Sequence, residues 1–150
     1  MVSEGLFVLK KKIKMSLKLN LKEEPFVFEV KNEDGAICLM DGSPDIGGKN
    51  KGLRPMQLLA SSIAGCASID ILLILRKQRI EPTHFSIDIE TKRVDEVPAI
   101  FEEVKLIFSV NKEVNKSKLD RAIKLTLEKY CSVSSSLKEE VNVIFETKFI

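Results

Sequence analysis

The chain has 150 residues, 44% of them hydrophobic and 31% charged, which suits one folded domain with its own core and excludes a disordered chain. The formal net charge is only +2, and Lys and Arg alternate with Asp and Glu, so composition gives no case for a nucleic-acid partner. The cysteines at 38, 66 and 131 are too widely spaced for a secreted disulfide framework. We therefore expect a reduced, cytoplasmic setting.

The N-terminal sequence lacks the pattern of a signal peptide. Its short apolar run precedes the lysines at 10–12, which is the reverse of the usual order, and no cleavage site of small residues follows. We expect residues 1–14 to be an N-terminal extension and residues 15–150 to form a single domain.

The first part of that domain has the periodicity of a β-sheet. Apolar residues alternate with polar ones from Met15 to Leu21, which predicts a strand. Two further strands are predicted over 25–30 and 36–40, joined by a segment whose Asp34-Gly35 pair is typical of a tight turn. Residues 41–54 then form a polar, glycine-rich loop.

A long apolar segment follows this loop. Pro55 is acceptable in the first turn of a helix, and we expect the helix to reach about Gln78. The segment is nearly long enough to cross a membrane, but its serines and Asp70 weaken that interpretation. Burial at the centre of a globular protein or of an interlocked dimer is favoured instead, and we expect no membrane partner.

The second half of the chain predicts two more strands, a helix and a last strand. The strands cover 84–93, 101–110 and 141–150. The helix lies between the second and third of these strands and ends at Tyr130. Its predicted cap is Ser117, with Asp120 three residues on as the capping partner. One face of that helix is expected to hold Leu119, Ala122, Ile123, Thr126, Leu127 and Tyr130. The predicted order is βββ-α-ββ-α-β, an α+β fold.

The cysteines are the candidate chemical groups. Cys66 lies midway along the first helix in the run SSIAGCASID, and Cys131 lies at the end of the second. Packing of the two helices could bring both thiols within bonding range. The competing interpretation is burial, because a free cysteine behaves as a small hydrophobic residue. Cys38, inside an alternating strand, is assigned to packing. The one histidine, His84, has no metal-ligand spacing around it, so we expect neither a metal nor another cofactor.

Three segments together resemble a known family: RPMQLLASSIAGCASIDILLILRKQRI, VPAIFEEVKLIFSV and RAIKLTLEKYCSVSSSL. They are similar to the OsmC/Ohr family of thiol-dependent peroxidases of organic hydroperoxides, and within it to the subgroup of the bacterial YhfA protein. The resemblance covers about Met15 to Ile150. It implies an intertwined homodimer with two central helices, Cys66 as the peroxidatic thiol, Cys131 as the resolving thiol that forms a disulfide with it, and a dithiol reductant such as a lipoyl group.

The family also has a glutamate ten residues before the first cysteine, which orients an arginine toward the thiol. Met56 occupies that position here, and Arg54 is the nearest candidate cation. Asp70, one helical turn after Cys66, would oppose a thiolate. Apolar residues near the thiol suit either an organic substrate or an ordinary core: Leu58, Leu59 and Ile63.

Two functions of different classes follow from these observations. The first is a peroxidase that reduces organic hydroperoxides through Cys66 and Cys131. The alternative is a non-enzymatic OsmC-like dimer that binds an apolar small molecule or a protein partner. Met56 and Asp70 favour the alternative, whereas a reactive and accessible Cys66 would favour the enzyme.

Overall fold

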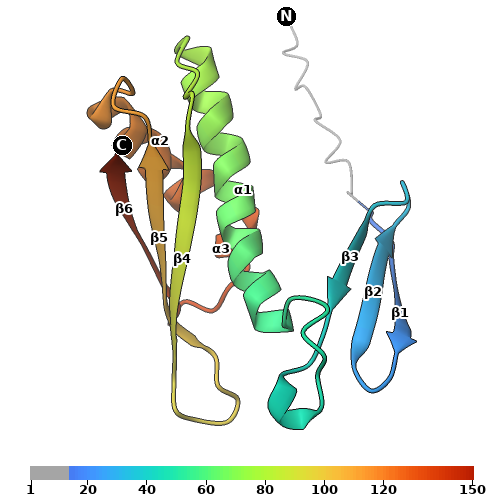
Figure 1. Ribbon diagram of the computed structural model, residues 1–150. Coiled ribbons are helices and arrows are strands. Elements are labelled where there is room, and N and C mark those ends of the chain that lie inside the picture. The colour runs from blue at the N-terminus through green and yellow to red at the C-terminus, as the bar shows by residue number, and fades with distance from the viewer. Residues whose placement is uncertain (1–13) are drawn as a thin grey trace, which may run out of the picture. The chain divides into compact units, whose positions relative to one another are not determined.

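The computed structural model describes residues 14–150 (Figure 1). These residues belong to two compact units whose boundary follows Pro55, and each unit is described here by itself. The predicted extension at 1–14 lies outside the described residues except for Lys14. A single domain over 15–150 stays a prediction.

The N-terminal unit is a three-stranded antiparallel sheet in the order β1-β2-β3. Its elements are β1 (Leu17–Glu23), β2 (Val27–Asn32), β3 (Ile37–Met40) and a short 3₁₀ helix, η1 (Pro44–Ile46). The three predicted strands are confirmed, and each begins one or two residues later than predicted. Gly35 in the predicted turn has φ of 87°, a conformation that glycine adopts without steric cost.

One face of this sheet is apolar and is not covered by its own unit. Directly opposed residues share a face, and Leu19 pairs with Val30, which pairs in turn with Cys38. The same registers add Leu17, Leu21, Phe28 and Met40. The side chains on β1 are about half exposed or more, and Cys38 is exposed too. Cys38 is therefore not packed within its own unit, and its assignment to packing stays a prediction for an assembly that covers this face.

A buried carboxylate organises the glycine-rich loop after β3. Asp41 is only 2% exposed, and it accepts hydrogen bonds from the backbone N–H groups of Gly42 at 2.7 Å, Lys49 at 2.9 Å and Lys51 at 3.1 Å. Burial raises the pKa of Asp41, but the three N–H groups outweigh it and the net pKa is lowered. The loop closes tightly, since a Cβ on Gly48 would lie 2.0 Å from the Gly42 carbonyl oxygen.

The C-terminal unit combines a second three-stranded sheet with the helices. Its elements are α1 (Pro55–Lys77), β4 (Phe85–Arg93), β5 (Phe101–Val110), α2 (Lys116–Leu125), the π-helical turn η2 (Thr126–Tyr130), α3 (Ser132–Ser135) and β6 (Asn142–Phe149). Central β5 pairs antiparallel with β4 and parallel with β6. The α+β class and the order βββ-α-ββ-α-β are confirmed, with the short α3 as an addition. Figure 1 shows α1 lying lengthwise beside this sheet.

The core of this unit lies between the sheet, α1 and α2. Alternate residues of β5 point into it and are fully buried: Val104, Leu106, Phe108 and Val110. The facing side of α1 combines alanines with larger aliphatic residues, and all of them are buried: Ala60, Ile63, Ala64, Ala67, Ile71 and Leu75. Phe85 of β4 meets Phe108 edge to face, with ring centroids 6.1 Å apart.

The opposite side of α1 is open. Its outer stripe consists of residues three or four positions apart: Ser62, Gly65, Ile69 and Leu73. Ile69 is 64% exposed and Leu73 47% exposed, and no atom outside the helix backbone lies within 4 Å of where a Cβ on Gly65 would be. Within its own unit, α1 is therefore covered on one side only.

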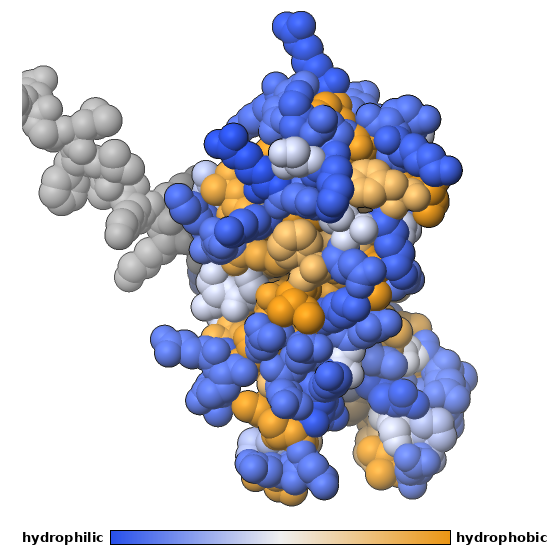
Figure 2. Space-filling model, turned by 90° about the vertical axis from the view of Figure 1, so that its left-hand side faces the viewer, coloured by the Kyte–Doolittle hydropathy of each residue, from blue (hydrophilic) through white to orange (hydrophobic). Residues whose placement is uncertain are grey.

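Among the residues described, α1 is the one helix that is long and apolar enough to cross a membrane, judged by length and composition alone. Core helices of soluble proteins pass the same test, so this observation by itself does not separate the two cases. The face of the molecule in Figure 2 is mainly hydrophilic, with hydrophobic residues gathered in patches between the charged ones.

The second predicted helix differs from the structure at both ends. The Asn115 side chain, not Ser117, caps α2 by accepting a hydrogen bond from the Lys118 N–H at 3.0 Å, so the helix begins at Lys116. At the other end the chain changes to a π-helical turn at Thr126. That change of winding removes Tyr130 from the buried face, and its side chain is 56% exposed.

Removal of the Phe108 ring tests the position of the core. Phe108→Ala should lower the free energy of unfolding by about 3–5 kcal/mol, because a fully buried ring is lost and a cavity remains. Val97→Ala, at a side chain that is wholly exposed, is the control and should change it by less than about 0.5 kcal/mol. Urea denaturation measures both. Equal losses in the two variants would contradict the assigned core.

Candidate active site

The structure brings two of the three thiols together. Cys66 lies in the middle of α1 and is half-buried, and the Cys131 thiol lies near enough to act on its pKa. All three cysteines are free, so the pair is in its reduced form. Cys38 belongs to the N-terminal unit. The structure therefore places Cys66 and Cys131 in the same region of the C-terminal unit, and their pairing as a redox couple stays a prediction.

Cys131 is held where two short helical segments meet. It ends η2, where its backbone N–H donates to the Thr126 carbonyl oxygen at 2.8 Å, and it caps the start of α3. Its side chain is fully buried. The sulfur accepts a hydrogen bond from the Ser134 N–H at 3.4 Å and donates to the Ile63 carbonyl oxygen at 3.9 Å. The second of these contacts ties Cys131 directly to α1, one turn before Cys66.

The start of α3 also acts on the Cys66 sulfur. The largest single influence is the Val133 N–H, which lowers the pKa of Cys66, and the Ser132 N–H acts in the same direction. Burial and the neighbouring Cys131 thiol oppose them. Burial and the Cys131 thiol outweigh the two N–H groups, so the net pKa of Cys66 is raised above that of an ordinary cysteine. The resting site is thus a protonated thiol with N–H donors already directed at it.

The other predicted residues are placed in different ways. Arg54 belongs to the N-terminal unit, so its role beside Cys66 stays a prediction. Asp70, predicted to oppose the thiolate, is not among the largest influences on the pKa of Cys66. Of the apolar residues near the thiol, Ile63 is a fully buried core residue, whereas Leu59 lines a pocket.

Sequence reasoning missed α3 and its N–H groups. It placed Cys66 midway along its own helix, and it did not foresee that another helix would begin beside the sulfur. The serines after Cys131 were the available signal, because serine favours helix N-termini. Cysteine is not a usual capping residue, so the cap itself could not be inferred.

Within residues 14–150, no group of three or more His, Cys, Asp and Glu side chains lies close enough together to hold a metal ion. The chemistry of the site is therefore derived from the two sulfurs and the backbone donors around them.

Comparison with known proteins identifies the family of the chain. A sequence model of the OsmC-like protein family matches residues 48–146. Protein YhfA of Escherichia coli strain K12 is 31% identical over 121 residues, which cover 80% of this chain and 87% of YhfA. The chain therefore belongs to the OsmC/Ohr family, as its motifs predicted.

Solved structures support the same fold. A hypothetical protein of Aquifex aeolicus is 31% identical and superposes with a TM-score of 0.73, covering 92% of this chain and 98% of its own. An organic hydroperoxide resistance protein OsmC of Legionella pneumophila is 19% identical, with a TM-score of 0.69 and coverage of 93% and 99%. The likeness to the Legionella protein shows a shared fold alone.

The pKa balance at Cys66 can be tested by substituting its neighbour. Cys131→Ser should lower the pKa of Cys66, because a hydroxyl can still cap α3 but carries no ionisable thiol. At fixed pH the thiolate fraction then rises, so Cys66 should react faster with iodoacetamide than in wild type. Rates across pH, read by mass spectrometry of the Cys66 peptide, give the pKa. Cys38→Ser is the control and should leave it unchanged; a rise in the pKa of Cys66 in Cys131→Ser would refute the assignment.

Proposed function

We propose that the protein is a thiol-dependent peroxidase that reduces organic hydroperoxides through Cys66 and Cys131. The observation that carries the proposal is the contact between the two thiols, one half-buried and one fully buried. The family supports the substrate class, since an OsmC relative is an organic hydroperoxide resistance protein.

In the first step the Cys66 thiolate attacks the terminal oxygen of the hydroperoxide. A sulfur–oxygen bond forms, the oxygen–oxygen bond breaks, and the alkoxide leaves and takes up a proton as the alcohol. Sulfur gives up two electrons and becomes a sulfenic acid. Cys66 is the attacking residue because its side chain is partly accessible, whereas that of Cys131 is not.

In the second step the Cys131 sulfur attacks Cys66. The disulfide forms, the sulfur–oxygen bond of the sulfenic acid breaks, and water leaves with the Cys131 proton. An external dithiol, such as a lipoyl group, then restores both thiols through a mixed disulfide. Because Cys131 is buried, the reductant is expected to attack the Cys66 sulfur.

The N–H groups of Ser132 and Val133 supply the activation in this proposal. The raised pKa keeps Cys66 largely protonated at rest, and the two donors stabilise negative charge on the sulfur as the proton leaves. Arg54 remains the proposed cation, on the strength of the family resemblance. The free thiols suit a reduced, cytoplasmic setting, which we include in the proposal.

One observation favours the alternative function. A thiol with a raised pKa has less thiolate at neutral pH, and a slow nucleophile suits a dimer that only binds an apolar small molecule or a protein. In that case the contact between the two thiols is ordinary packing and turnover is absent.

We propose further that the protein is a homodimer with the two copies of α1 at its centre. Two apolar surfaces support this: the outer stripe of α1 and the open face of the β1-β2-β3 sheet. Each is left exposed by its own unit, and exposed apolar patches commonly mark interfaces. A second copy supplies matching surfaces of the same kind.

Substitution of each thiol separates the two steps. Cys66→Ser should abolish consumption of cumene hydroperoxide with a dithiol. Cys131→Ser should consume one equivalent and stop, with Cys66 trapped as a sulfenic acid that dimedone labels. Cys38→Ser is the matched control and should turn over like wild type. Peroxide loss is followed by a colorimetric assay and the adducts by mass spectrometry.

Two results would count against the peroxidase. Wild-type protein that consumes no organic hydroperoxide with any dithiol supports the binding dimer instead. A disulfide that includes Cys38 in peptide maps of the oxidised protein would contradict the assigned pair.

The dimer proposal predicts that a charge on the outer stripe separates the copies. Ile69→Arg should shift the protein from dimer to monomer in light scattering at micromolar concentration, since a charge cannot be buried cheaply in an apolar interface. Val97→Arg, at an exposed apolar residue in the β4–β5 connection, should remain dimeric. A stable folded monomer in the wild type would remove the claim.

A further inference from the structure

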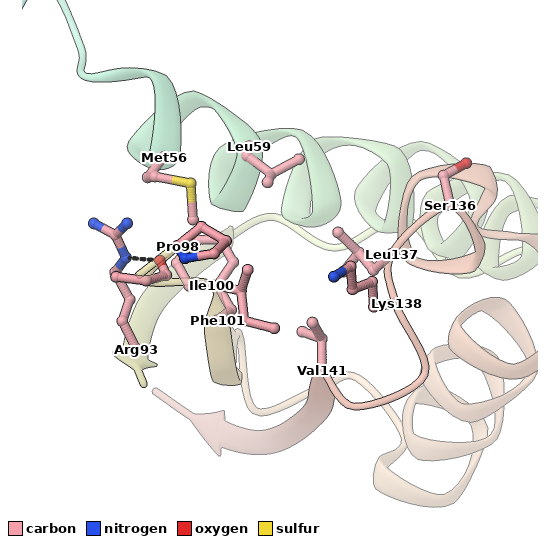
Figure 3. A pocket seen from close by; sticks show the side chains of 11 residues that line it. Met56, Leu59, Arg93, Pro98, Ile100, Phe101, Ser136, Leu137, Lys138 and Val141 are labelled. Atoms are coloured by element: carbon pink, nitrogen blue, oxygen red, sulfur yellow. Dashed lines mark hydrogen bonds between the residues drawn. The ribbon is translucent and has the colours of Figure 1, made fainter. Parts of the chain in front are cut away.

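A pocket of about 340 Å³ lies at the start of α1 in the C-terminal unit (Figure 3). Three parts of the chain line it: α1, the connection from β4 to β5, and the segment that follows α3. Neither thiol is among the residues that line it, so the proposed peroxide chemistry does not account for it.

Most of the pocket wall is apolar. Met56 and Leu59 of α1 face Ile100 and Phe101 at the start of β5, and Leu137 adds a further aliphatic side chain (Figure 3). Phe101 is 3% exposed, and its ring belongs to the core. Core packing therefore fixes the position of this part of the wall. Such a wall favours a hydrocarbon group over a polar one.

Two cations complete the lining. The Lys138 ammonium points toward the middle of the pocket, whereas Arg93 lies on the other side of it in the same view (Figure 3). The Arg93 Nε donates to the Ala99 carbonyl oxygen at 2.6 Å, which holds the guanidinium at the edge of the pocket. The two positive charges are therefore placed by different segments of the chain.

No carboxylate of the described residues lines the pocket to neutralise these charges. The acidic residues within three positions of Arg93 or Lys138 are all exposed and stand outside the lining: Glu90, Asp95, Glu96, Glu139 and Glu140. Neither Arg93 nor Lys138 forms an ion pair among residues 14–150. The pocket thus combines an apolar wall with a local excess of positive charge.

We propose that this pocket binds a small amphiphilic monocarboxylate. The carboxylate accepts hydrogen bonds from the Lys138 ammonium and lies in the field of Arg93, and the hydrocarbon part packs on Met56, Leu59 and Leu137. The volume is near the lower end of the roughly 300–1,000 Å³ of small-molecule sites, which suits a chain of medium length.

Octanoate is the probe for this site. Titration of ¹⁵N-labelled full-length protein should shift the amide signals of residues 93–101 and 136–141 in a saturable way. The neutral analogue octanol, which lacks the charge, and acetate, which lacks the chain, should each bind at least about tenfold more weakly. Isothermal calorimetry gives the same affinities without labels.

Two variants separate binding in this pocket from a general attraction of octanoate to positive charge. Lys138→Gln should weaken octanoate about tenfold and leave octanol unchanged, because only the charged contact is lost. Lys112→Gln removes an exposed positive charge elsewhere in the same unit and should bind octanoate like wild type. Cys66→Ser should also bind normally, so failure of the peroxidase proposal would leave this measurement intact.

Three outcomes would overturn the inference. Equal affinities for octanoate and octanol would mean that the cations take no part. Shifts confined to other residues would place the ligand elsewhere. Signals of 93–101 and 136–141 that respond to protein concentration and not to octanoate would mean that a second copy of the chain fills the pocket.

Discussion

The C-terminal unit depends on the hydrophobic core that α1 shares with the central strand β5. The buried side of α1 consists of alanines and larger aliphatic residues, and its outer side carries Ile69 and Leu73. The helix is therefore apolar on both sides. One side forms the core and the other remains open. Cys66 lies between them, half-buried, which is the degree of exposure that thiol chemistry requires. The same contact that stabilises the unit therefore also positions its candidate nucleophile.

Two opposing influences meet at the Cys66 sulfur. Burial and the second thiol keep it protonated, while N–H groups at the start of α3 favour the anion. In a site of this kind the thiol is protonated at rest, and the N–H groups stabilise the sulfur only as negative charge develops on it. Preorganised donors act in this way in many enzymes. The arrangement needs no charged side chain in the same unit, and it gives a physical role to the segment after Cys131.

The regular elements were predictable from the sequence, and the junctions between them were not. Period-two alternation predicted the strands, and a long, mainly apolar segment predicted α1. By contrast, the sequence predicted a Ser117 cap, whereas Asn115, a residue type that caps helices equally well, holds that position in the structure. The π-helical turn and α3 depend on how Cys131 meets α1, which no local pattern contains. The exposure of Cys38 in its own unit was not predictable for a related reason: alternation indicates which face is apolar but not whether that face is covered.

The π-helical turn before Cys131 has a consequence for how relatives are compared. Between Thr126 and Cys131 the chain carries one residue more per turn than an α-helix would. Loss of a single residue there would leave the buried face of α2 in place, yet would rotate the next side chain by about 100° around the helix axis. A homologue can thus keep a cysteine near this position in an alignment and still lack the pair. The length of the segment, counted residue by residue, is the better marker of shared chemistry.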